Sequence, residues 1–120
     1  MSKKLVDKTV LIVEGDRTER NRLSRLLSRK GCYVKCAKDL RSAYRIIEHD
    51  APACILLDVD MPHVDLQSFY SRLSEIDGNS PIIVMTADGA ALKKARTSFD
   101  VLKKPIGDDD LVHTIRETLT

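Results

Sequence analysis

The stretch ACILLDVDMP, residues 53–62, decides the fold of this chain. It begins with five apolar residues, Ala53 to Leu57, and continues with two carboxylates, Asp58 and Asp60, before a proline. A continuous apolar run of this length is typical of a strand that is covered on both faces of a sheet. The two carboxylates that follow the run place negative charge at the point where the strand ends.

The same alternation of patterns continues along the rest of the chain. Besides 53–57, we expect strands at 9–13, 33–36, 81–85 and 100–102, and helices at 18–30, from Asp39, from Asp65, at 90–97 and from Asp108. Asp16 and Glu19 resemble a capping box before the first helix, and Gly31 suits its end. Five strands that alternate with five helices predict a parallel sheet with helices on both faces. The pattern alone leaves the strand order open.

The composition indicates one globular domain, which we expect to comprise residues 1–120. With 42% hydrophobic and 32% charged residues, the chain is neither a disordered tail nor a membrane span. Its first residues, MSKKLVDK, are basic but lack the hydrophobic stretch of a secretory signal, so we expect a cytoplasmic location and no membrane partner. Three cysteines, Cys32, Cys36 and Cys54, cannot all pair within the chain, and we expect reduced thiols.

Basic residues concentrate in the first part of the sequence. Residues 1–50 contain 13 Lys and Arg against 7 Asp and Glu, whereas residues 51–120 contain 7 against 11. This pattern favours solvated helix faces, with a nucleic acid or an acidic partner as the alternative. The chain has no Trp and only 4% aromatic residues, so we expect no direct binding of nucleic acid by base stacking.

Four of the expected strands end in polar groups of complementary kinds. They are followed or closed by Glu14, Asp58, Thr86 and Lys104, respectively. In open α/β sheets, ligands bind at the carboxyl ends of the strands. Carboxylates beside a hydroxyl and a lysine could hold a divalent cation and a phosphoryl group. Each residue alone is more often a turn or cap residue, and the combination carries the prediction.

Four segments, in this order, make the sequence similar to the receiver domains of two-component response regulators. They are Val10–Glu14, Ile55–Pro62, Pro81–Ala87 and Leu102–Pro105, within a resemblance that extends over roughly residues 7–119. The resemblance implies an α/β fold of the flavodoxin-like (βα)5 type, a doubly wound parallel sheet with strand order 2-1-3-4-5. In that order the first and third strands are neighbours, so Glu14 and Asp58 would face each other.

The resemblance also implies a phosphorylation mechanism. Asp58 corresponds to the phosphoacceptor, which takes a phosphoryl group from a phosphohistidine of a histidine kinase or phosphotransfer protein. Thr86 and Lys104 match the hydroxyl and the lysine that act beside the acceptor, the lysine in a Lys-Pro bond that is usually cis in the family. Such a domain is not an enzyme, apart from hydrolysis of its own acyl phosphate.

The metal site departs from the family pattern. The Mg²⁺ ligands of relatives correspond here to Glu14, Asp58 and the backbone carbonyl of Asp60. The second member of the acidic pair after the first strand is replaced by Gly15, which offers no side-chain oxygen. We therefore expect the Mg²⁺ affinity to be lower by at least ~10-fold, with Asp16 as a further candidate ligand.

Two further departures concern the output face. Relatives carry Tyr or Phe three residues before the lysine, where this chain has Val101. The segment from Thr86 to Lys104 is about four residues shorter than in typical relatives, roughly one helical turn, so its helix should be short, displaced or absent. Two interpretations remain open: a phosphorylatable switch, which we favour, and a pseudo-receiver that acts as a phosphorylation-independent interaction module.

The partners implied are a histidine kinase or phosphotransfer protein and an output domain or downstream protein. A homodimer is also compatible with the resemblance. Relatives bind the kinase through the first helix, which here contains Arg17, Arg20, Arg22, Arg25 and Arg29. A solvated helix face is the alternative interpretation of these arginines.

Overall fold

A parallel sheet of five strands runs through the molecule in the order β2-β1-β3-β4-β5. This is a computed structural model, and it describes residues 5–76 and 80–119, so the first four residues of the basic N-terminal segment lie outside it. The strands are β1 (Thr9–Val13), β2 (Tyr33–Ala37), β3 (Cys54–Asp58), β4 (Ile82–Thr86) and β5 (Asp100–Lys103). The helices are α1 (Arg17–Arg29), α2 (Leu40–His49), α3 (Leu66–Ile76), α4 (Gly89–Ala95) and α5 (Asp108–Thr118). The flavodoxin-like (βα)5 fold and its strand order are confirmed.

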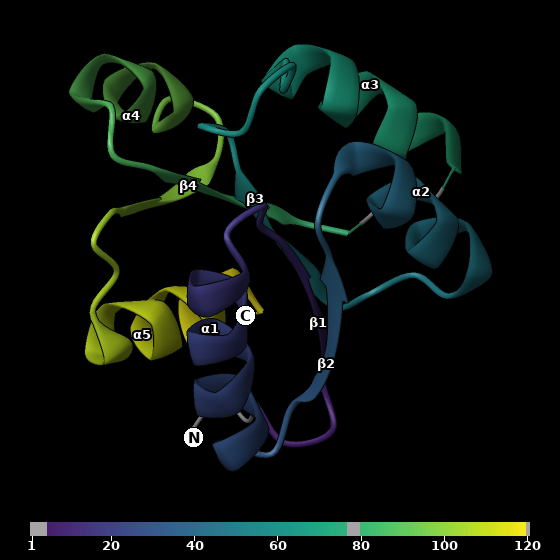
Figure 1. The fold of residues 1–120 in the computed structure, drawn as a ribbon, viewed down its shortest axis with the longest axis vertical. Helices are drawn as coiled ribbons and strands as arrows, with labels where there is room; N and C mark the ends of the chain where they lie inside the picture. Colours follow the sequence, from purple (N-terminus) through teal and green to yellow (C-terminus); the bar gives the residue numbers. More distant parts are fainter. Residues whose placement is uncertain (1–4, 77–79, 120) are drawn as a thin grey trace.

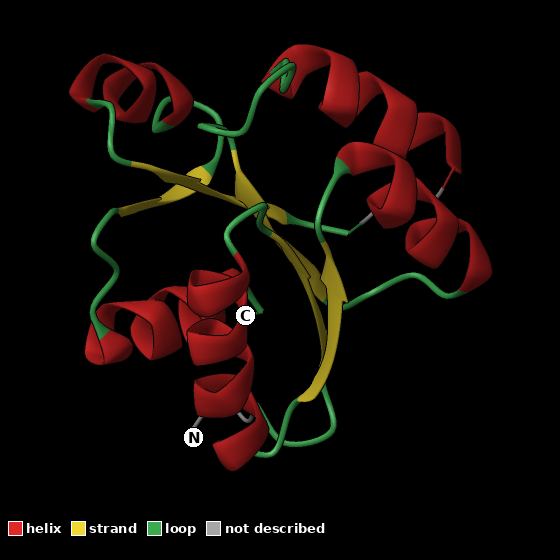
Figure 2. Cartoon of the chain, in the orientation of Figure 1, coloured by secondary structure: helices red, strands yellow, loops and turns green. Residues whose placement is uncertain are grey.

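Helices cover both faces of the sheet, as Figures 1 and 2 show. Helices α1 and α5 pack on one face, and α2, α3 and α4 pack on the other. All five residues of β3 are buried, as the apolar run predicted. Successive residues of β3 serve opposite faces, because Leu56 joins the core under α1 and α5 whereas Leu57 joins the core under α2 and α3.

The register of the strands brings the polar residues to one edge. Strands β1 and β3 pair with Val13 opposite Leu57, and β4 and β5 pair with Thr86 opposite Lys103. The residues that follow these pairs leave the sheet at the edge where all five parallel strands end. This edge is where ligands bind in doubly wound sheets.

The start of α1 differs in part from the predicted capping box. Asp16 caps the helix as expected, because its side chain accepts a hydrogen bond from the Thr18 backbone N–H at 3.0 Å. Glu19 does not complete the box and instead pairs with Arg22 at 2.6 Å. The reason is that the Asp16 backbone N–H already donates to Glu14 Oε1 at 3.1 Å. A site residue has taken the role that the box assigns to Glu19.

The helices differ in length, and α4 is the shortest of those described. It has 7 residues, against 13 in α1, so the helix before β5 is present and short. Its buried residues are Leu92 and Ala95, so it still contributes to the core. None of the helices in residues 5–76 and 80–119 has the length and apolar character needed to cross a bilayer.

Gly31 and Gly89 make a matched pair for testing the backbone. Gly31 has φ +92°, and a Cβ there would lie 3.0 Å from Val6 Cγ2. We expect Gly31→Ala to lower the free energy of unfolding by about 1–3 kcal/mol, because alanine is strained in the left-handed region. Gly89→Ala, where an added Cβ meets nothing within 4 Å, should leave stability unchanged or slightly raised. Urea denaturation followed by circular dichroism measures both, and equal losses in the two variants would contradict a special backbone requirement at Gly31.

Candidate functional site

Lys104 lies among three carboxylates at the carboxyl edge of the sheet. Its Nζ is 2.7 Å from Asp58 Oδ1, 3.6 Å from Asp60 Oδ2 and 3.8 Å from Glu14 Oε2. The bond to Pro105 that follows this lysine is cis, as the resemblance implied. Burial lowers the pKa of Lys104, but the carboxylates, Asp58 first, outweigh it and raise the pKa above its ordinary value. The ammonium group is therefore held in its charged form.

The buried polar side chains of the described residues all belong to this edge. They are Glu14, Asp58 and Thr86, which are 2%, 4% and 0% exposed. Burial of ionised groups is costly unless partners compensate it. Three neighbouring strands each end in a buried polar group at the same edge of the sheet. This arrangement indicates a functional site. The predicted residues Glu14, Asp58, Thr86 and Lys104 are thus brought together.

Among the carboxylates of Glu14, Asp58 and Asp60, that of Glu14 has the fewest partners to compensate its burial. One of its oxygens accepts a hydrogen bond from the Asp16 N–H, whereas Oε2 is buried and has no hydrogen-bond partner. Burial, together with the neighbouring Asp58 carboxylate, raises the pKa of Glu14 to about 7. The backbone beside it is fixed by Arg20, whose guanidinium donates to the Glu14 carbonyl at 2.8 Å.

Asp58 is held in place from two sides. Its Oδ1 accepts hydrogen bonds from Lys104 Nζ at 2.7 Å and from the Asp60 backbone N–H at 2.9 Å. The second bond closes a tight turn directly after β3. The carboxylate is therefore oriented by a charged donor and by its own chain, in a buried position at the strand end.

Asp60 uses its side chain in a way that the sequence did not predict. The Thr86 hydroxyl donates to Asp60 Oδ1, and the Ala87 backbone N–H donates to Oδ2 at 2.8 Å. Burial raises the pKa of Asp60, but the hydrogen bonds from Thr86 and Ala87 and the charge of Lys104 outweigh it and hold the pKa below its ordinary value. Because Asp60 lies in the turn after β3 and not in the strand, the alternation of side chains along the strand does not predict where its side chain points.

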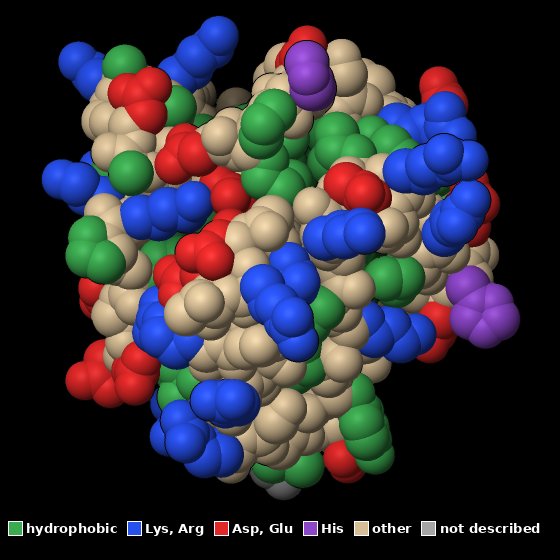
Figure 3. Space-filling view, in the orientation of Figure 1, with side chains coloured by type: hydrophobic (Ala, Val, Ile, Leu, Met, Phe, Trp, Pro, Cys, Tyr) green, Lys and Arg blue, Asp and Glu red, His purple; other side chains and the backbone are tan. Residues whose placement is uncertain are grey.

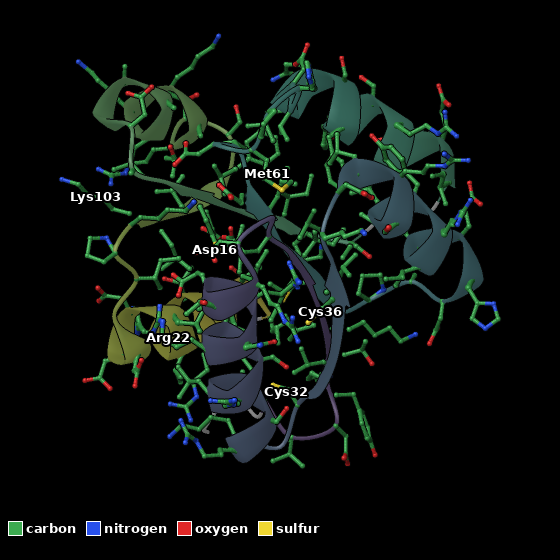
Figure 4. All side chains as sticks on the ribbon, in the orientation of Figure 1. Asp16, Arg22, Cys32, Cys36, Met61 and Lys103 are labelled. Atoms are coloured by element: carbon green, nitrogen blue, oxygen red, sulfur yellow. The ribbon has the colours of Figure 1, made fainter. Side chains whose placement is uncertain are left out.

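Asp16, the further candidate metal ligand, is engaged as the cap of α1 through Thr18. At Gly15 an added Cβ would lie 3.4 Å from Met61 Sδ and 3.8 Å from the Lys38 carbonyl oxygen, which are ordinary contact distances. Figure 4 labels Asp16 and Met61 near the end of β1. A larger side chain at position 15 is therefore sterically acceptable.

The oxygen donors at this edge suit a hard divalent cation such as Mg²⁺. Glu14 Oε2 is buried without a hydrogen-bond donor, and three carboxylates face the single positive charge of Lys104. In the part of the chain that the structure describes, no three side chains of His, Cys, Asp or Glu are arranged so that they could hold a metal ion together. The fit therefore depends on two carboxylates, Glu14 and Asp58, with backbone oxygen completing the set.

Arg22 ties α1 to the loop that follows Lys104. Its guanidinium donates to the Ile106 carbonyl at 2.9 Å and pairs with Asp108 at 3.2 Å. Lys and Arg side chains elsewhere on the face seen in Figure 3 intermix with Asp and Glu.

Val101, which stands where relatives carry Tyr or Phe, is half-buried in β5. Phe99 lies two residues before it in the chain and packs edge-on against Tyr70, with ring centroids 5.8 Å apart. The three cysteines are free; Cys32 and Cys54 are buried and Cys36 is exposed. None of these residues contacts the cluster around Lys104 in the hydrogen bonds and ion pairs that the structure shows for them.

Comparison with known proteins agrees with this geometry. The family model described as the response regulator receiver domain matches residues 10–116. The chain is 32% identical over 114 residues to the response regulator MprA of Mycolicibacterium vanbaalenii and to MprA of Mycobacterium leprae, covering 92% of this chain in both cases. It spans about half the length of these curated relatives, 49% and 50%.

Solved structures show the same fold. A protein described as a response regulator from Chloroflexus aurantiacus superposes with a TM-score of 0.83 at 26% identity, over 94% of this chain and 98% of the other. The chemotaxis protein CheY4 of Vibrio cholerae superposes with a TM-score of 0.84 at 22% identity, over 95% of this chain and 100% of the other. The second likeness bears on the fold alone.

The buried Glu14 carboxyl predicts how stability depends on pH without metal. Its pKa is raised in the folded protein to about 7, so the folded state binds the proton more tightly than the unfolded state does. The free energy of unfolding should therefore fall as the pH rises from about 4.5 through 7. Urea denaturation in EDTA at a series of pH values measures this. Glu14→Gln should lose this contribution. If the variant kept the pH dependence of the wild type, the assignment of this dependence to Glu14 would be contradicted.

Proposed function

This chain belongs to the response regulator receiver family, and we propose that it accepts a phosphoryl group on Asp58 from a histidine kinase or phosphotransfer protein. The observation that carries this proposal is the buried Asp58 carboxylate, 4% exposed, held by Lys104 at 2.7 Å at the carboxyl edge of the sheet. Residues 1–120 act as one receiver domain in this proposal. The chain itself is a phosphoacceptor and not an enzyme.

The transfer begins with attack of an Asp58 carboxylate oxygen on the phosphorus of the phosphohistidine. A P–O bond forms and the P–N bond breaks, and the imidazole leaves with the electron pair of that bond and takes up a proton. An acyl phosphate on Asp58 is the product. Because nucleophile and phosphoryl group are both anionic, the positive charge of Lys104 lowers the barrier, and the Thr86 hydroxyl is a donor for the phosphoryl oxygens.

Glu14, Asp58 and the backbone carbonyl of Asp60 are the groups that would hold Mg²⁺. When bound, the ion supplies neutralisation of the phosphoryl oxygens during transfer. Gly15 removes one carboxylate from this set, and Asp16 is occupied as the cap of α1. We therefore propose that Mg²⁺ binding is weaker than in a receiver with a complete acidic pair.

The partners follow from the family and remain part of the proposal. The phosphodonor would dock near α1, which begins three residues after Glu14 and so adjoins the site. Since the curated relatives are about twice as long as this chain, an output domain or a downstream protein would receive the signal. A homodimer is a further assembly to examine, and the cytoplasm is the compartment we assign.

Phosphorylation is tested by mass spectrometry of the protein incubated with Mg²⁺ and acetyl phosphate. We expect a mass gain of one phosphoryl group in the wild type and none in Asp58→Asn, because the amide is not a nucleophile of comparable strength. Circular dichroism establishes that the variant is folded. A gain of equal size in Asp58→Asn would place the acceptor elsewhere, and no gain in any condition would favour a phosphorylation-independent interaction module.

The role of Gly15 is tested by restoring the carboxylate. Gly15→Asp should raise the Mg²⁺ affinity by at least ~10-fold, because it adds a negatively charged oxygen ligand beside Glu14. Gly15→Asn has the same shape without the charge and should raise the affinity much less. Isothermal titration calorimetry measures both, and equal affinities in the two variants would refute a direct metal role for this position.

A further inference from the structure

The Asp60 carboxylate fills the place where donors for an anion converge beside Asp58. Its two oxygens accept from the Thr86 hydroxyl and from the Ala87 N–H, and Oδ2 lies 3.6 Å from Lys104 Nζ. These are a hydroxyl, a backbone amide and an ammonium group that come from the ends of two neighbouring strands, β4 and β5. Such convergence of donors is how proteins hold oxyanions.

The arrangement is more than a loop contact. Asp60 lies two residues after Asp58 in the chain, and its backbone N–H donates to Asp58 Oδ1 at 2.9 Å. The turn therefore fixes the backbone of Asp60 against the acceptor and directs its side chain to β4. Thr86 is fully buried, and its hydroxyl oxygen accepts a hydrogen bond from the Asp88 N–H at 3.0 Å. The hydroxyl has a single hydrogen to donate, and Asp60 receives it.

We propose that the Asp60 carboxylate is a built-in competitor for the phosphoryl group, holding the donors Thr86, Ala87 and Lys104 until phosphorylation of Asp58 displaces it. This proposal rests on the function proposed above. A phosphoryl group on Asp58 carries oxygens that need the same donors. The single hydrogen of the Thr86 hydroxyl cannot be donated to the phosphoryl group and to the Asp60 carboxylate at once, so one of these anions loses the hydrogen bond.

The Asp60 side chain has room to rotate away from these donors. It is 32% exposed, in contrast to the 5% of the Asp58 side chain, so it lies at the rim of the site. Rotation toward solvent costs its hydrogen bonds but leaves the ion hydrated. The backbone carbonyl of Asp60, the proposed metal ligand, stays in place when only the side chain turns.

The test compares the rate of phosphorylation by acetyl phosphate with Mg²⁺ in the wild type, Asp60→Asn and Asp60→Ala. Both variants keep the backbone carbonyl and remove the competing charge. We expect their rates of mass gain to exceed that of the wild type by at least about 10-fold, the effect of releasing a charge-assisted hydrogen bond. The matched control is Asp65→Asn, which removes one exposed carboxylate after β3 and keeps an oxygen for the N–H of Gln67. Its rate should lie within about twofold of the wild type.

A second readout does not depend on phosphoryl transfer. Inorganic phosphate is titrated into isotope-labelled protein while NMR follows the Ala87 amide signal. We expect a saturable shift in Asp60→Ala and a much weaker one in the wild type, since the carboxylate no longer fills the site.

The two readouts separate failure of this proposal from failure of the proposed function. Phosphate binding in Asp60→Ala without any mass gain would support the competitor and count against phosphorylation of Asp58. Asp60 variants that gain mass no faster than the wild type would overturn the competitor even though Asp58 is phosphorylated. If Asp60→Ala responds in neither measurement, the competitor is likewise overturned.

Discussion

The attraction between Lys104 and the carboxylates that surround it is the interaction on which this site depends. Two of those carboxylates, Glu14 and Asp58, are almost fully buried, and burial of ionised groups without a partner is strongly unfavourable. Lys104 reaches both of them, and Asp60, from the end of an edge strand. The parallel register of β1, β3, β4 and β5 delivers these groups to one place, so the sheet that forms the core also concentrates the charge.

The sequence predicted the sheet well, and it predicted the gathering of four polar residues at one edge, for a physical reason. A buried parallel strand is a continuous apolar run, and its end is marked by the first polar residue, as at Leu57 and Asp58. Because parallel strands end at one edge, the strand ends place Glu14, Asp58, Thr86 and Lys104 along the same edge, and the strand order then makes them neighbours. The strand order came from the resemblance to receiver domains, since periodicity does not encode which strands are neighbours.

Side-chain direction is what the sequence could not supply. Glu19 and Asp60 are acidic residues near a helix end and a strand end, and their types alone permit a cap, a ligand or an ion pair. The structure assigns Glu19 to Arg22, and Asp60 to Thr86 and Ala87. Each of these pairings depends on a group a few ångströms away. For example, the Asp16 N–H already donates a hydrogen bond to Glu14 and so is not available to Glu19.

The outer strands of the sheet have a consequence for how copies of the molecule meet. Strand β5 has four residues, and its two ends, Asp100 and Lys103, are both exposed and charged. On the opposite side, β2 carries Lys35, which pairs with Asp50 at 3.6 Å. Short, charged outer strands resist continuation of a sheet from one molecule into the next, which is a common route to aggregates. In concentrated solutions of this protein, growth of one sheet from molecule to molecule is therefore disfavoured.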